Sequence, residues 1–228
     1  MKEWENVWEK DNKYLDLMVR RANGKEPIME CTKQLIRLAK PNYKKGQSFL
    51  DVTCSTGHYL YAFRKMLDKN IIYFGVDNNS RYVDAAIKIF GKDYFAVGDV
   101  NALPFRDRSF DVVFCFNTLQ NLPDIFTPLA QLMRVSKDYV YIRTLIGESQ
   151  YYIKEHVDDG VVYHNIHTFK QIKQFARDSG FSAKLIPDEY DASVFSKSHK
   201  GDTQVIDGKQ VIGNIIYSWA IIMFRRMR

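Results

Sequence analysis

The stretch that decides the fold is an apolar run that ends in an acid and passes into small residues, Ser48-Phe49-Leu50-Asp51-Val52-Thr53-Cys54-Ser55-Thr56-Gly57. The apolar residues of 59–63 come next and predict a helix, and a second apolar run, 71–76, ends at Asp77. This order of strand, loop, helix, strand and acid is typical of a site for an adenosine-containing cofactor. Small loop residues let the backbone approach the ligand, and an acid after the second strand can accept both hydroxyls of a ribose.

Alternation of apolar strands and amphipathic helices continues along the chain. Expected strands lie at 48–53, 71–76, 94–98, 110–116 and 138–145, and expected helices lie at 58–68, 80–90 and 125–135. This alternation predicts an α/β fold with a doubly wound, Rossmann-like and mostly parallel sheet that has helices on both faces. We expect the strand order 3-2-1-4-5. A later helix (168–179) and strand (near 181–187) precede an antiparallel closing strand at 213–224, which we place beside the fifth strand.

The length of 228 residues and a hydrophobic content of 46% suit a single domain over residues 1–228. Within it we distinguish an N-terminal helical lid (1–44), a cofactor-binding core (45–145) and a substrate-side region of insertions and closing strands (146–228). Candidate lid residues over the cofactor are Trp4, Trp8 and Tyr14. Aromatic residues at helical spacing are, however, more often part of a core.

Composition places limits on location and partners. The cysteines, at positions 31, 54 and 115, form no CxxC pair, which predicts reduced thiols and a cytoplasmic protein. No apolar run reaches membrane-spanning length, and the N-terminus lacks the apolar core of a signal peptide, so we expect no membrane insertion. The net charge of +6 permits an anionic partner, but the basic residues are scattered, which argues against nucleic acid.

Two features of the loop separate the candidate cofactors. Nicotinamide enzymes use three glycines so that a pyrophosphate can lie on the helix N-terminus, whereas this loop contains only Gly57. A carboxylate at Asp51 would repel a pyrophosphate but would suit an ammonium or a sulfonium. S-adenosylmethionine has no phosphate and has a positive sulfonium, and it therefore fits the loop better than NAD.

Four motifs in order resemble the class I S-adenosylmethionine-dependent methyltransferases, and in particular their small-molecule branch. The first motif of that family, (D/E)-x-G-x-G-x-G, falls on Asp51, Thr53, Ser55 and Gly57. The second and third are acids after the second and third strands, at Asp77 and Asp99. The fourth, L-P-F-x-D-x-S-F-D-x-V, matches 103–113. The resemblance covers about 45–145 and implies methyl transfer from S-adenosyl-L-methionine to a small-molecule acceptor.

The resemblance also implies a role for each motif. Asp77 would accept the ribose hydroxyls, and Asp99 would accept from the adenine amino group, with Val100 or Asn78 against the ring. Asp51 would hold the sulfonium or amino end. The residues after the fourth strand would line the methyl and methionine region: Asn117, Thr118 and Leu119. Simpler alternatives are a helix cap for Asp77, a loop aspartate that bonds its own backbone for Asp99, and a plain strand end at 117–119.

Thr53 and Ser55 stand where the family usually has glycine. A side chain there crowds the cofactor and strains a turn that prefers positive φ, although the Ser55 hydroxyl could donate to the carboxylate of the methionine moiety. A non-catalytic binding subunit with the same fold is therefore one alternative. An RNA methyltransferase is another, favoured by the basic balance and disfavoured by the lack of an appended RNA-binding module or a basic stripe.

The acceptor site is expected in 146–167 and 188–212, where the alternation of strands and helices stops. Candidate general bases there are His156, His164 and His167. A base is needed only if the acceptor loses a proton, as a sugar hydroxyl would, and each histidine alone is more often a surface or packing residue.

His164-x-x-His167 has no third or fourth ligand nearby, so we expect no metal. Short similarities at 141–148 and 212–219 to methyltransferases of surface-polysaccharide and sugar pathways favour a sugar or nucleotide-sugar acceptor. The sequence leaves the oligomeric state open, including a homodimer.

Overall fold

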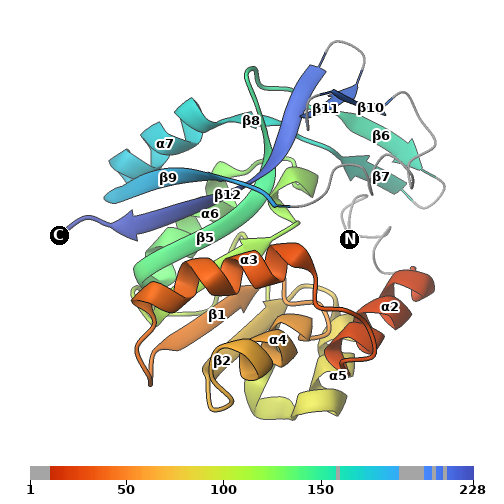
Figure 1. Cartoon of the computed structure of the whole chain (residues 1–228), viewed down its shortest axis with the longest axis vertical. Helices are drawn as coiled ribbons and strands as arrows, with labels where there is room; N and C mark the ends of the chain where they lie inside the picture. The colour runs from red at the N-terminus through yellow and green to blue at the C-terminus, as the bar shows by residue number, and fades with distance from the viewer. Residues whose placement is uncertain (1–10, 158–159, 190–202, 207–208, 213–214) are drawn as a thin grey trace.

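The computed structural model describes residues 11–157, 160–189, 203–206, 209–212 and 215–228. One large sheet runs through the protein in the order β10-β11-β12-β5-β4-β1-β2-β3, with β8 paired to β5 and β9 paired to β12 (Figure 1). The core strands are β1 (Ser48–Val52), β2 (Ile72–Asp77), β3 (Phe95–Val97), β4 (Phe110–Phe116) and β5 (Ser136–Gly147). Their pairings are all parallel, so the predicted order 3-2-1-4-5 is confirmed.

The sheet is closed by a long antiparallel strand, β12 (Ile215–Arg226). Its pairing with β5 runs from Tyr217 opposite Gly147 to Arg225 opposite Tyr139, which confirms the predicted closing strand. On its other side, β12 pairs first with β11 (Lys209–Ile212) and then with β9 (Phe181–Pro187), both antiparallel. β10 (Thr203–Ile206) pairs with β11, and β8 (His167–Thr168) extends the sheet beside β5.

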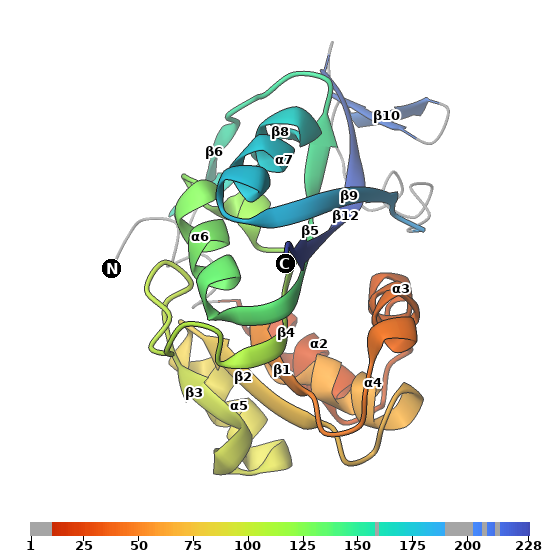
Figure 2. The same cartoon turned by 90° about the vertical axis from the view of Figure 1, so that its left-hand side faces the viewer.

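Helices cover both faces, because successive strand residues point to opposite sides of a sheet. Phe49 and Phe114 pack with α3 (Glu30–Ala39), α4 (His58–Met66) and α5 (Ser80–Phe90). Leu50 and Val113 pack on the other face with α6 (Phe126–Val135) and α7 (Phe169–Asp178). Figure 2 shows α6 and α7 on one side of β5, and α3 and α4 on the other. The predicted two-faced architecture is therefore confirmed.

The first described element is α2 (Asn12–Ala22), which begins where the Asp11 carboxylate accepts from the Tyr14 amide at 2.8 Å. It packs against α4 and α5 through a face that includes the buried Met18. Trp4 and Trp8, two of the expected lid aromatics, lie outside the described residues. Short 3-10 turns complete the helical elements: η1 (Lys40–Asn42), η2 (Lys92–Tyr94) and η3 (Leu119–Asn121).

The two regions expected to be irregular contain strands of their own, which corrects that expectation. β6 (Lys154–Val157) and β7 (Gly160–Tyr163) form a separate two-stranded antiparallel sheet, and β10 and β11 form a hairpin within 188–212. Such hairpins need no long apolar run, because their strands pair locally and leave one face to solvent. None of the helices in the described ranges combines the length and the apolar character that crossing a membrane requires.

Candidate functional site

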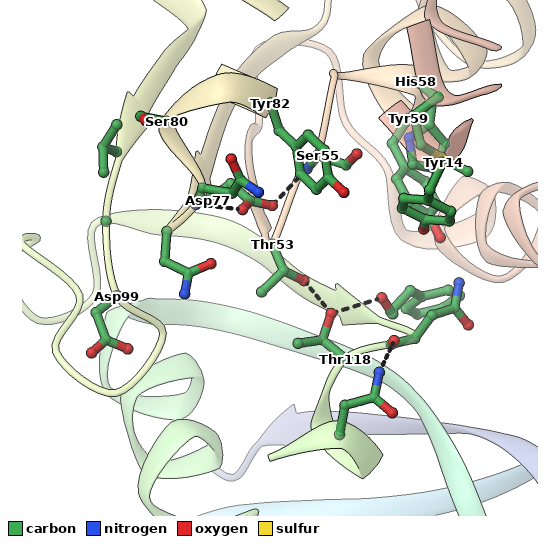
Figure 3. Close-up of a pocket in the computed structure, with 18 of the residues that line it drawn as sticks. Tyr14, Thr53, Ser55, His58, Tyr59, Asp77, Ser80, Tyr82, Asp99 and Thr118 are labelled. Atoms are coloured by element: carbon green, nitrogen blue, oxygen red, sulfur yellow. Dashed lines mark hydrogen bonds between the residues drawn. The ribbon is translucent and has the colours of Figure 1, made fainter. Parts of the chain in front are cut away.

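A cavity of about 450 Å³ lies at the carboxyl ends of the central parallel strands (Figure 3). Its walls come from the residues that follow β1 and β2, from the end of β3 and from the end of β4. In open α/β sheets this is where ligands bind, next to the point at which the strand order reverses, here between β1 and β4. A volume of this size is in the range of small-molecule and cofactor sites.

The predicted cofactor residues divide into two groups. Those that line the cavity are Thr53, Ser55, Asp77, Asn78, Asp99, Asn117 and Thr118. Those outside its lining are Asp51, Gly57, Val100 and Leu119. The first group comes from four different loops, so the fold brings together residues that are up to 65 positions apart, such as Thr53 and Thr118.

The loop after β1 has the left-handed backbone that was expected at the glycine positions of the motif. The φ angles are 67° at Thr53, 50° at Ser55 and 80° at Gly57. For a residue other than glycine this region costs about 1–2 kcal/mol. The loop is held in place by hydrogen bonds to β2: the Thr53 and Cys54 amides donate to the Val76 carbonyl at 2.7 and 3.0 Å. Anchoring to the neighbouring strand offsets the strain and fixes the backbone at the cavity.

Gly57 serves the packing below the cavity. A Cβ atom added there would lie 2.6 Å from the Phe95 ring, closer than real Cβ atoms approach other heavy atoms. With its positive φ, Gly57 lets the chain turn into α4 directly above the aromatic ring of β3. The motif glycine is therefore required by close approach and backbone conformation.

Asp77 both supports the loop and faces the cavity. Its carboxylate accepts from the Ser55 amide at 2.8 Å, a bond drawn as a dashed line in Figure 3, and from the Asn79 amide at 3.0 Å. Burial raises the pKa of Asp77 to about 6, against the opposing effect of these amides. A carboxylate offers about four acceptor positions, so sites remain for donors on a ligand in the cavity.

Asp51 lies beneath the loop. It is the fourth residue of β1, its side chain is 1% exposed, and it accepts a hydrogen bond from the Tyr73 hydroxyl. Burial raises the pKa of Asp51 well above its usual range. The motif places this acid at the strand end, but the structure turns its side chain into the sheet, where it contacts β2.

Thr53 joins two walls of the cavity. Its hydroxyl lies 2.8 Å from that of Thr118, and the two side chains point toward one another in Figure 3. Asn117, the first residue after β4, has a φ of 63° and also lines the cavity. The loops after β1 and β4 are thus connected by a threonine at a position where the family motif has glycine.

Asp99 faces the cavity and also organises its own loop, since it accepts from the Asn101 amide at 2.8 Å. This hydrogen bond is the simpler alternative for an aspartate in a loop, and the structure contains it alongside the exposure to the cavity. Val100 and Leu119 belong to the buried core next to α6. Each directly follows a cavity residue, Asp99 and Thr118 respectively, so the chain turns from the cavity into the core at these two positions.

One wall was largely missed by sequence reasoning. It is formed by apolar and aromatic side chains of α2, α4 and α5 and of the segment before α3: Tyr14, Met18, Met29, His58, Tyr59 and Tyr82. Only Tyr14 was a candidate, through its aromatic spacing. The position of His58 and Tyr59 directly after Gly57 is the signal that could have identified them, because the first turn of α4 starts at the cavity.

Three side chains on these walls have buried polar atoms with no hydrogen-bond partner in the described part of the chain. They are the Ser55 hydroxyl, both ring nitrogens of His58 and the Tyr59 hydroxyl. Burial lowers the pKa of His58 to about 3, so the ring is neutral at physiological pH. Buried polar groups normally have partners. A carboxylate of a ligand in this cavity would accept a hydrogen bond from the Ser55 hydroxyl.

The three predicted bases lie away from the cavity lining. His156 is exposed on β6, and His164 is half-buried with its Nε2 3.2 Å from the Glu155 carboxylate. His167 is 1% exposed on β8, where burial lowers its pKa to about 4. Their segment reaches the cavity rim through Asn165, which donates to the Gln120 and Leu122 carbonyls at 2.8 and 2.7 Å. In the described ranges no group of three His, Cys, Asp or Glu side chains could hold a metal ion.

The chain was compared with known proteins. A family described as "Methyltransferase domain" matches residues 43–191. A demethylmenaquinone methyltransferase of Lactobacillus johnsonii is 34% identical over 104 residues, which are 43% of this chain and 43% of the relative. A tRNA U34 carboxymethyltransferase of Nautilia profundicola is 28% identical over 106 residues, 42% of this chain and 33% of the relative. The chain thus spans less than half the length of these curated relatives.

Among solved structures, a phosphoethanolamine N-methyltransferase 2 of Haemonchus contortus in complex with S-adenosyl-L-methionine has the same fold. Its TM-score is 0.66 at 15% identity, over 98% of this chain and 60% of that protein. The chain belongs to the methyltransferase domain family, with the fold of the class I S-adenosylmethionine-dependent enzymes.

Proposed function

We propose that this chain transfers a methyl group from S-adenosylmethionine to a small-molecule acceptor. The observation that carries the proposal is the charge of the cavity. Its lining contains the carboxylates of Asp77 and Asp99 and, among the described residues, no lysine or arginine. Such walls favour a ligand with positive charge and many hydroxyl or amino donors, and disfavour a pyrophosphate. S-adenosylmethionine has a positive sulfonium and no phosphate, whereas NAD carries a pyrophosphate that these walls would repel.

The cavity residues fit the parts of this cofactor. Asp77 would accept the ribose hydroxyls, Asp99 the adenine amino group, and the Ser55 hydroxyl would donate to the methionine carboxylate. Asn117 and Thr118 would lie at the reacting end. S-adenosylmethionine supplies an activated methyl group on a sulfonium. The task of the protein is therefore alignment, which can supply most of the acceleration of such a transfer.

The wall of Tyr14, Met18 and Met29 supports an acceptor with an apolar face. Because the described lining has no lysine or arginine, it offers no charge partner for a diphosphate. Of the two carbohydrate acceptors suggested by the sequence, a sugar hydroxyl is therefore better supported than a nucleotide sugar. If the acceptor must lose a proton, His156, His164 and His167 remain the candidate bases; His58 lines the cavity, but its lowered pKa makes it a poor proton acceptor near neutral pH.

The proposal is tested by methyl transfer from S-adenosylmethionine labelled in its methyl group. The acceptor panel contains phenolic and quinol rings, free sugars, nucleotide sugars and transfer RNA, the last because one relative is named for a tRNA. Label in a small uncharged acceptor supports the proposal. Label in RNA alone would favour the nucleic-acid alternative, and absence of S-adenosylmethionine binding would favour an inert fold. Asp77→Ala serves as the control that should not transfer.

A further inference from the structure

Asn117 is held in an unfavourable backbone conformation at the reacting end of the cavity. It follows β4 directly, lines the cavity, and has a φ of 63° without being a glycine. Asparagine tolerates this region better than most residues, but strain of this kind persists only where the surroundings impose it. The question is which contacts impose it here.

Arg143 of β5 holds Asn117 at both its main chain and its side chain. The Asn117 amide donates to the Arg143 carbonyl at 3.2 Å, one residue beyond the paired positions Phe116 and Arg143 of the sheet. The Nη1 group of Arg143 donates to the side-chain oxygen of Asn117. Arg143 therefore contacts both the backbone amide and the side chain of Asn117, while the Asn117 carbonyl accepts from the Gln120 side-chain amide at 2.7 Å.

Arg143 is itself fixed by a buried ion pair. Its Nε and Nη2 groups both contact the Asp188 carboxylate, and the two side chains are 5% and 3% exposed. The guanidinium carbon of Arg143 lies 4.0 Å from the centroid of the Trp219 ring on β12. A buried ion pair is weak as a source of stability, because desolvation offsets its attraction and an apolar replacement is often as stable. The planar guanidinium group of Arg143, fixed by Asp188 and Trp219, is well suited to orienting Asn117.

The same contacts extend to α3. The Gln34 amide group donates to the Pro187 carbonyl at 2.7 Å, and its side-chain oxygen accepts from the Glu189 amide at 3.1 Å. These bonds fix the segment that contains Asp188 between α3 and the end of β9. A continuous set of contacts thus runs from α3 through Asp188 and Arg143 to Asn117 in the cavity.

We propose that Arg143 is a positioning residue for methyl transfer: held by Asp188, it keeps Asn117 in the left-handed conformation that shapes the reacting end of the cofactor cavity. This role rests on the proposed function. Arg143 contacts neither cofactor nor acceptor in it and acts through Asn117. The ion pair also makes the cavity sensitive to the position of 187–189, on the substrate side of the fold.

The test compares variants by calorimetric binding of S-adenosylhomocysteine. Arg143→Lys keeps the charge beside Asp188 but loses the planar fork, and we expect about tenfold weaker binding, the effect of losing one charge-assisted hydrogen bond. Glycine adopts positive φ without a clamp. Asn117→Gly should therefore bind S-adenosylhomocysteine more tightly than Asn117→Ala, and adding Arg143→Lys to Asn117→Gly should weaken its binding by less than about twofold. Asn117→Ala, which lacks both the clamp and the freedom of glycine, should bind about tenfold more weakly.

Arg226→Lys is the matched control. Arg226 donates to the Met133 and Ser136 carbonyls at 2.7 and 2.8 Å, away from the cavity lining. We expect it to lower thermal stability without changing binding, whereas Arg143→Lys changes binding. If Arg143→Lys fails to fold, Asp188→Asn and the comparison of Asn117→Gly with Asn117→Ala test the same role.

Equal affinities of Arg143→Lys and the unchanged chain for S-adenosylhomocysteine would overturn the positioning role alone. An equally large loss of affinity when Arg143→Lys is added to Asn117→Gly would overturn it too. So would equal binding by Asn117→Gly and Asn117→Ala. An unchanged chain that does not bind S-adenosylhomocysteine would instead overturn the proposed function, and the positioning role with it.

Discussion

At the scale of single residues, Asp77 is the side chain on which the cavity depends most. It holds the Ser55 amide and faces the ligand space. Asp77→Ala should weaken S-adenosylhomocysteine binding by about 30- to 1,000-fold, since losing a buried charged acceptor costs about 2–4 kcal/mol. Asp77→Asn keeps a side-chain oxygen that can accept from the Ser55 and Asn79 amides, so it should weaken binding less than Asp77→Ala. Calorimetry measures both, with circular dichroism as a check of folding. An unchanged dissociation constant for the alanine variant would leave Asp77 as a cap only.

The pKa of Asp77 gives a pH dependence. Burial raises it from 3.8 to about 6, so the folded chain binds this proton more tightly than the unfolded chain. The contribution of Asp77 to the free energy of unfolding therefore falls as pH rises from about 4 to about 6. Ribose donors favour the charged carboxylate, so S-adenosylhomocysteine affinity should rise over the same interval and be flat above it. Asp77→Asn should remove this dependence, and an affinity that falls from pH 5 to pH 7 would contradict it.

Ser55 and Thr53 share a strained backbone but differ in what their hydroxyls contact. The Thr53 hydroxyl is bonded to Thr118, whereas the Ser55 hydroxyl is buried without a partner in the described ranges. Ser55→Gly should relieve strain yet weaken S-adenosylhomocysteine binding about tenfold, because a donor to the carboxylate is lost. Thr53→Gly is the matched control and should change binding by less than about threefold. Identical affinities for Ser55→Gly and the parent would refute a role for this hydroxyl.

At the scale of elements, the sequence predicted the parts of the fold that depend on long-range burial. Strands β1 to β5, their order and the closing strand follow from alternating apolar segments, because each must bury its faces against helices. The strands β6, β7, β10 and β11 were missed, since they pair locally and require little apolar sequence. The missed strands also explain why two of the predicted bases lie outside the cavity lining. The chain after β5 folds into its own hairpin, which carries His156 and leads directly to His164.

The same limit applies within the motifs. A motif identifies which loop reaches the ligand, but which of two neighbouring residues faces it depends on backbone twist at that point. Thr118 lines the cavity while Leu119 is in the core, and Asp99 lines it while Val100 is in the core. The aromatic wall of α2 and α4 could not be predicted from the motifs, because those helices meet the cavity only through tertiary packing.

The contact between the β6–β7 segment and η3 allows a prediction for these elements. Asn165 donates to the Leu122 carbonyl at 2.7 Å, and Leu122 lines the cavity. Asn165→Ala leaves that buried carbonyl unpaired, which should lower the free energy of unfolding by about 1–3 kcal/mol and loosen the rim. Denaturant unfolding measures the loss. His164→Ala, one residue away and half-buried at the surface, should change the free energy of unfolding by less than about 0.5 kcal/mol. Equal effects would show that Asn165 does not hold the rim.

At the scale of the whole molecule, charge and cavity point to different partners. The net charge of +6 would suit an anionic ligand such as RNA. The described cavity lining has the opposite character, with two aspartates and no lysine or arginine. The surface charge therefore says little about the ligand in the cavity.

The most direct measurement is calorimetric titration of the unchanged chain with S-adenosylhomocysteine and, separately, with NAD, at neutral pH. Both ligands contain an adenosine, so the comparison isolates the loop after β1 and the acids of the cavity. We predict saturable one-to-one binding of S-adenosylhomocysteine and no measurable binding of NAD at the same concentrations. Equal or tighter binding of NAD, or no binding of S-adenosylhomocysteine, would contradict the assignment of this cavity to a methyl-donor cofactor.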